Sequence, residues 1–100
     1  MRIITERRIR EFYAKNKQSE SAFRDWIQVV RVADWQSFSD VRNSFNHVDV
    51  HNKLTVFDVG GNKFRIIAKI EYAKHLVFIK FVLTHSGYDK HSNWCDCGQK

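Results

Sequence analysis

The sequence predicts an α+β fold in which two or three helices pack on one face of a small, mainly antiparallel sheet. Apolar residues recur at helical spacing in the first part of the chain and at alternate positions in the second part. The chain has no proline, internal repeat or low-complexity tract that would mark a linker. We therefore expect one domain over residues 1–90, with the other face of its sheet open, and a C-terminal tail over residues 91–100.

The first two predicted elements are a short strand and an amphipathic helix. Residues 1–4 form a short run that suits a strand. Ile9, Phe12 and Tyr13 then follow at i, i+3 and i+4, which predicts a helix from Thr5 to about Asn16.

A second, longer helix is predicted after Ser19, whose side chain we expect to cap it. Its apolar positions form a wide stripe consisting of Ala22, Phe23, Trp26, Ile27, Val29, Val30 and Ala33. Trp26 and Trp35 allow two interpretations, namely platforms for stacked bases or core residues. Apolar neighbours at helical spacing favour the core.

The next segment joins the helices to the sheet. Ser37 and Asp40 have the spacing of a capping box, which predicts a short third helix and a structural role for Asp40. Residues 46–53 form a polar approach that contains His47 and His51. This pair would suit a metal if it lay on a helix, but the alternating valines favour a loop or a strand.

Three strands in a meander are predicted for the last part of the domain. Residues 54–59 are rich in strand-forming side chains, residues 60–62 are a glycine-rich turn, and residues 63–71 alternate apolar and charged positions. A further apolar run covers residues 76–83. The first two runs therefore predict a hairpin, to which the third adds an antiparallel strand.

Strand alternation assigns these side chains to two faces. The apolar sets expected on the core side are Phe64, Ile66, Ala68 and Ile70, followed by Val77, Ile79, Phe81 and Leu83. Arg65, Lys69 and Lys80 would then share the open face, beside the strand end that carries His85. We therefore expect a cationic surface with titratable groups at its rim.

Charge and composition point to a polyanionic partner. Seventeen Lys and Arg residues against eleven Asp and Glu give a formal net charge of +6. Nucleic acid is the first candidate partner and an acidic protein the second. The sequence lacks a run of about 18 apolar residues and an apolar signal segment. We therefore expect a cytoplasmic protein that does not associate with a membrane.

Cys95 and Cys97 lie one residue apart beside His91, close to the C-terminus. A disulfide between them would be strained, and a zinc site needs four ligands, usually at wider spacing. We interpret this stretch as a polar tail with free thiols, and we expect neither a metal nor another cofactor.

Several short motifs together resemble the HigB toxins of bacterial type II toxin-antitoxin modules. The matching segments are residues 33–37 with Asp40 and Val41, residues 57–67, Thr84 and His85, and residues 88–90. The similarity extends from Ile3 to about Lys90. It departs from the family at Asp58, where Asn is usual, and at Gly87, where Glu is usual. Asp58, in a strand before the turn, is interpreted as structural.

This resemblance implies a RelE-like fold and a ribosome-dependent mRNA endonuclease that is silenced by a HigA antitoxin with a helix-turn-helix. Metal-free RNA cleavage needs a base for the 2′-hydroxyl, an acid for the leaving 5′-oxygen, and cations around the phosphorane. The catalytic candidates are Arg65, His85, Tyr88 and Asp89, and the RNA-binding candidates are Lys63, Lys69, Lys80 and Lys90.

The roles of these candidates differ. Arg65 offers a planar fork for two phosphate oxygens. His85 is suited to be either base or acid, because the unperturbed pKa of imidazole is about 6.5. Tyr88 could donate a proton or stack on a base, and Asp89 could orient His85, bind Lys90 or cap the turn.

Two other functions remain open from the sequence. One is a non-catalytic RNA- or ribosome-binding module that uses the same basic face. The other is a protein-binding partner of an acidic factor.

Overall fold

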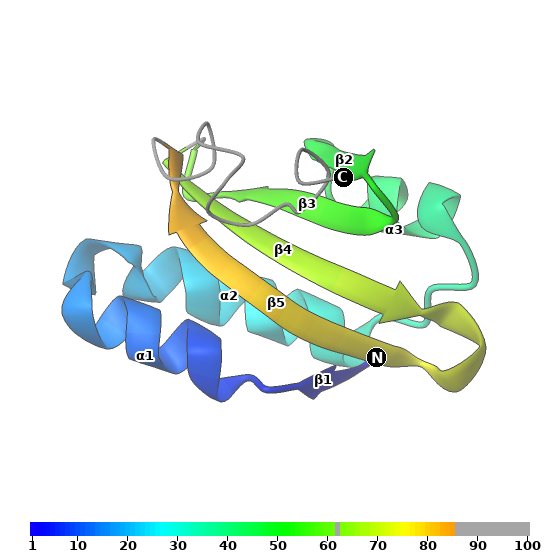
Figure 1. Ribbon diagram of the computed structural model, residues 1–100, viewed down its shortest axis with the longest axis horizontal. Helices are drawn as coiled ribbons and strands as arrows, with labels where there is room; N and C mark the ends of the chain where they lie inside the picture. The colour runs from blue at the N-terminus through cyan, green and yellow to red at the C-terminus, as the bar shows by residue number, and fades with distance from the viewer. Residues whose placement is uncertain (62, 86–100) are drawn as a thin grey trace, which may run out of the picture.

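The computed structural model describes residues 1–61 and 63–85. Its regular elements are β1 (Arg2–Ile4), α1 (Arg7–Lys15), α2 (Glu20–Val32), α3 (Phe38–Ser44), β2 (Val48–His51), β3 (Leu54–Val59), β4 (Phe64–Glu71) and β5 (Leu76–Thr84). The five strands form one sheet in the order β1-β5-β4-β3-β2. Helices α1 and α2 lie side by side across one face of this sheet (Figure 1). The predicted α+β class is confirmed.

The meander contains four strands, one more than the three predicted from the sequence. Strands β2 to β5 pair antiparallel in chain order, and β1 pairs parallel to β5. β2 comes from the polar approach, for which a loop or a strand had been left open. Asn52 and Lys53, which join β2 to β3, have φ values of 53° and 69°. Positive φ at both residues of a two-residue loop suits the twist of a hairpin.

The helices begin and end close to the predicted residues, but their caps differ. Ser19 does not cap α2, because it is the last residue of a 3-10 turn (Lys17–Ser19) in the helical conformation. Its hydroxyl donates instead to the carbonyl oxygen of Asn16, at 2.6 Å. Ser37 also makes no side-chain cap, whereas the Asp40 carboxylate accepts from the backbone N–H of Gln36 at 2.8 Å. The structural role predicted for Asp40 is thus confirmed.

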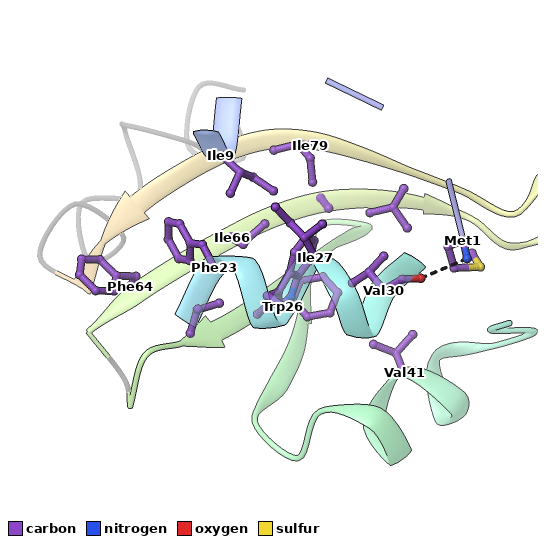
Figure 2. Packing of buried hydrophobic residues seen from close by; sticks show 14 of the residues in the cluster. Met1, Ile9, Phe23, Trp26, Ile27, Val30, Val41, Phe64, Ile66 and Ile79 are labelled. Atoms are coloured by element: carbon purple, nitrogen blue, oxygen red, sulfur yellow. Dashed lines mark hydrogen bonds between the residues drawn. The ribbon is translucent and has the colours of Figure 1, made fainter. Parts of the chain in front are cut away.

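The main core lies between the helices and the sheet and is dominated by aromatic rings. Phe57 is fully buried and its ring centroid lies 5.1 Å from that of Trp26, 5.4 Å from Phe45 and 6.2 Å from Trp35. Trp26 and Trp35 are each only 2% exposed, so both are core residues. Figure 2 shows how Phe23, Trp26 and their neighbours from α2 point toward the sheet.

The N-terminal ammonium ties β1 to the end of α2. It donates to the carbonyl oxygen of Val30 at 3.1 Å (Figure 2). It also donates to the carbonyl oxygen of Ala33 at 2.6 Å. A positive charge is favoured at this end of a helix, where the last carbonyl groups lack intrahelical partners. No helix in the described part of the chain is long and apolar enough to span a membrane.

A bulge in β5 changes which side chains face the core. Ile67 pairs with Phe81 and Ala68 pairs with Ile79, so Lys80 is left out of the register. The extra residue reverses the alternation that follows it. Phe81 and Leu83 therefore lie on the face away from the helices, and the prediction that they face the core was wrong. They pack there in a second apolar cluster with Leu54, Val56 and Ile67.

Candidate active site

The candidate site lies on the face of the sheet away from the helices. Asp58 on β3 and Arg65 on β4 are register partners. Both point away from the main core, because Phe57 and Phe64, their chain neighbours, belong to it. The backbone N–H of His85 donates to the carbonyl oxygen of Lys63 at 2.9 Å. This bond extends the β4–β5 pairing and places His85 beside Arg65.

Contacts with Asp58, Phe64 and His85 hold the guanidinium of Arg65 within the described part of the chain. Its Nε lies 2.8 Å from Oδ1 of Asp58, its Nη1 donates to the carbonyl oxygen of Phe64 at 3.2 Å, and its Nη2 lies 3.0 Å from Nδ1 of His85. Arg65 is only 5% exposed. It lies on the predicted face, but as a buried side chain held in an ion pair. A buried charge needs such partners, so Asp58 and Arg65 have to be considered together.

The contact between Arg65 and His85 assigns a role to one nitrogen of the imidazole. A guanidinium carries only N–H donors, so Nδ1 of His85 has to accept the hydrogen bond. The lone pair of Nδ1 is therefore engaged by Arg65.

A hollow of about 320 Å³ lies beside this ion pair. Its lining residues come from β2, β3 and β4 and the segment before β2: Asn46, His47, Val48, Asp49, Val56, Asp58 and Arg65. His47 and Asp49 were not among the site residues predicted from the sequence. Strand alternation would have pointed to them if residues 48–51 had been predicted as a strand.

Two of the predicted lysines, Lys69 and Lys80, do not line the hollow beside Arg65. Lys69 lies on the same face as Arg65, and its ammonium is 3.3 Å from the carboxylate of Glu71. The ammonium of Lys80, at the bulge, lies 6.0 Å from the centroid of the Phe78 ring, and Lys80 lines a groove between α1 and β5. That Lys80 shares an RNA-binding surface with Arg65 and Lys69 stays a prediction.

The remaining predictions concern other parts of the chain. Tyr88, Asp89 and Lys90 lie outside the described residues, as do Gly87 and the segment with Cys95 and Cys97. Within residues 1–61 and 63–85, no group of three or more His, Cys, Asp or Glu side chains is arranged to hold a metal ion.

Comparison with known proteins identifies the family to which this chain belongs. The model of the HigB toxin family, described as the RelE-like toxic component of a toxin-antitoxin system, matches residues 19–91. An mRNA interferase HigB of Escherichia coli O6:H1 is 31% identical over 93 residues, which cover 90% of each chain. The mRNA interferase toxin HigB of E. coli K12 is 28% identical over 89% of this chain and 88% of its own. The chain therefore belongs to the HigB toxin family of toxin-antitoxin systems.

Proposed function

We propose that this toxin is an endoribonuclease that cleaves mRNA positioned on the ribosome and thereby inhibits translation. Two relatives that align over nearly the whole chain are named mRNA interferases. The observation that carries the proposal is the 3.0 Å contact between the Arg65 guanidinium and the His85 imidazole, next to a hollow at the surface. We propose that these two side chains act on the same ribonucleotide linkage, Arg65 as a phosphate-binding fork and His85 as a proton-transfer group.

The proposed reaction is a transesterification without a metal. The 2′-oxygen attacks the phosphorus, the bond to the 5′-oxygen breaks, and a 2′,3′-cyclic phosphate or its opened form remains. Arg65 would stabilise the charge that develops on the phosphorane oxygens. His85 would transfer a proton, assisted by Tyr88 and Asp89, and Lys63, Lys69, Lys80 and Lys90 would attract the RNA backbone.

Membership of a toxin-antitoxin family implies an antitoxin as partner. We propose that this partner is of the HigA type, with a helix-turn-helix, and that both proteins act in the cytoplasm. A small helix-turn-helix protein encoded directly downstream would support this pairing.

The test is to incubate the purified toxin with translating ribosomes and to map the ends of the mRNA. We expect new ends within the translated message that are absent when the toxin is omitted. Ribosome binding with intact messages would contradict the proposal and favour a non-catalytic binding module. The same assay with naked mRNA shows whether cleavage depends on the ribosome.

A further inference from the structure

The reaction proposed above requires two proton transfers, and the Arg65–His85 contact bears on which groups supply them. One group has to remove the proton of the 2′-hydroxyl, and another has to protonate the leaving 5′-oxygen. In the described arrangement the lone pair of His85 Nδ1 accepts a hydrogen bond from Arg65. We therefore look for the base that starts the reaction among the described residues that line the hollow beside Arg65.

His47 is placed on the opposite side of the Asp58–Arg65 pair from His85. Its carbonyl oxygen accepts a hydrogen bond from the backbone N–H of Asp58 at 3.2 Å, so it lies next to Asp58 across the β2–β3 pairing. Val48, the next residue, packs against the main core, so the side chain of His47 points to the other face. It is exposed there and lines the hollow together with Arg65.

His47, Asp58 and Arg65 thus follow one another across β2, β3 and β4, and the polar row ends at His85, which lies diagonally from Arg65 and meets it through their side chains. Adjacent strands are about 4.8 Å apart, so the backbones at His47 and Arg65 are separated by roughly 10 Å. Side chains that extend from both positions can reach a single phosphodiester between them. Two imidazoles on either side of an arginine fork would suit a reaction in which the attacking and leaving oxygens lie on opposite sides of phosphorus.

The other polar groups in the hollow are less suited to remove the proton. Asp49 Oδ1 accepts a hydrogen bond from the backbone N–H of Val50 at 2.8 Å, and the carboxylate of Asp58 is paired with Arg65. Asn46 carries an amide, which does not accept a proton near neutral pH. Among residues 1–61 and 63–85, the charged groups that share the hollow with His47 are Asp49, Asp58 and Arg65.

We propose that His47 is a catalytic residue, the general base of the cleavage reaction, an inference that rests on the nuclease function proposed above. The imidazole of His47 takes the proton of the 2′-hydroxyl as the 2′-oxygen forms its bond to phosphorus. The bond between phosphorus and the 5′-oxygen breaks with its electron pair on the oxygen. When the phosphate engages the Arg65 guanidinium, His85 is released from it. A proton donor on the same side of Arg65 as His85 then protonates the leaving 5′-oxygen.

The test compares His47→Gln with His51→Gln. His51 is a matched control, because it is a histidine on the same face of β2 by alternation and does not line the hollow. Single-turnover cleavage of ribosome-bound mRNA is measured between about pH 5.5 and 8.5, which brackets the unperturbed pKa of imidazole. Binding is measured separately with a message that carries a 2′-deoxynucleotide at the cleaved position.

We expect His47→Gln to slow cleavage by about 100-fold or more and to remove the rise in rate with pH on the acidic side. Its affinity for the 2′-deoxy message should stay at the wild-type value, and His51→Gln should match the wild type in every measurement. If His47→Gln cleaves with the wild-type rate and pH profile, the inference is overturned and the nuclease function stands. If it loses binding instead, His47 holds RNA and is not the base. Absence of cleavage by the wild-type toxin would overturn both proposals.

Discussion

The two faces of the sheet carry different kinds of side chains. The face under the helices is filled by aromatic and branched side chains that contact one another closely around Phe57. The opposite face has a smaller apolar cluster that receives no side chain from a described helix, and a row of polar groups runs beside it. The first face therefore supplies most of the stability, whereas the second bears buried charge that stability alone does not require.

This difference teaches that a strand position has to be judged by its partners as well as by its exposure. Arg65 is as deeply buried as Phe64, its neighbour in β4, since each is 5% exposed. Phe64 contacts the rings of Phe12 and Phe23, whereas Arg65 binds a carboxylate and an imidazole. A substitution on the first face should therefore act mainly on folding. A substitution of Arg65 or His47 in the polar row should act mainly on cleavage, provided that Arg65 keeps its charge beside Asp58.

The largest effect on folding is expected from Phe57→Ala. Removal of this fully buried ring should lower the free energy of unfolding by about 3 to 5 kcal/mol, because a cavity forms among Trp26, Trp35 and Phe45. The matched variant on the second face is Phe81→Ala, whose ring is only partly buried. Urea denaturation should show a clearly smaller loss for Phe81→Ala. Equal losses would contradict the assignment of stability to the helical face.

The largest effect on cleavage without loss of folding is expected from Arg65→Lys. Lysine keeps the positive charge next to Asp58 but lacks the fork that contacts phosphate oxygens and His85 together. Cleavage of ribosome-bound mRNA should fall by about 100-fold or more. Arg65→Ala is less informative, because it also leaves the carboxylate of Asp58 unpaired. A melting temperature that collapses in Arg65→Lys would make the arginine structural.

A smaller effect is expected at Asp58. Asp58→Ala leaves the buried guanidinium without its carboxylate and should lower the free energy of unfolding by about 1 to 3 kcal/mol. Asp58→Asn retains an oxygen that accepts from Nε of Arg65. Thermal denaturation should place Asp58→Asn close to the wild type. Identical losses in the two variants would show that the hydrogen bond to Arg65 contributes little.

The smallest effect concerns Tyr72, which lies far from the polar row. Partial burial raises the pKa of its phenol above the ordinary value, and the negative charge of Asp40 raises it further. Because the folded state disfavours tyrosinate, this contribution to stability is complete below about pH 10 and is lost as the pH rises through the folded pKa. Absorbance titration of the wild type against Tyr72→Phe should resolve this late-titrating phenol. Titration of Tyr72 at or below the ordinary value would contradict its placement.

Features that depend on local periodicity were predictable from the sequence. The apolar stripes of α1 and α2, the glycine turn after β3 and the apolar run of β5 each lie within one segment. Features that depend on pairing between segments were missed. The bulge at Lys80 appears only in the register of β4 with β5, and the strand β2 only through its pairing with β3.

The residues of the candidate site could likewise be predicted only where the evidence lay within one segment. Arg65 and His85 were identified through residue chemistry and family resemblance, and the structure places them in contact. Asp58 was interpreted as a structural residue, because its partner lies across the hairpin and cannot be identified from its own strand. His47 was assigned to a polar approach, and only the pairing of β2 with β3 brings it beside Asp58.

We propose that the polar row of the second face cleaves RNA by attack of the RNA's 2′-hydroxyl on the neighbouring phosphate. The most direct measurement is the chemistry of the new 3′ end on mRNA cleaved during translation, for the normal message and for one with a 2′-deoxynucleotide at the mapped position. We predict a 2′,3′-cyclic phosphate or its opened form in the first and no cut at that position in the second. Free 3′-hydroxyl ends, or unchanged cleavage of the 2′-deoxy message, would contradict it.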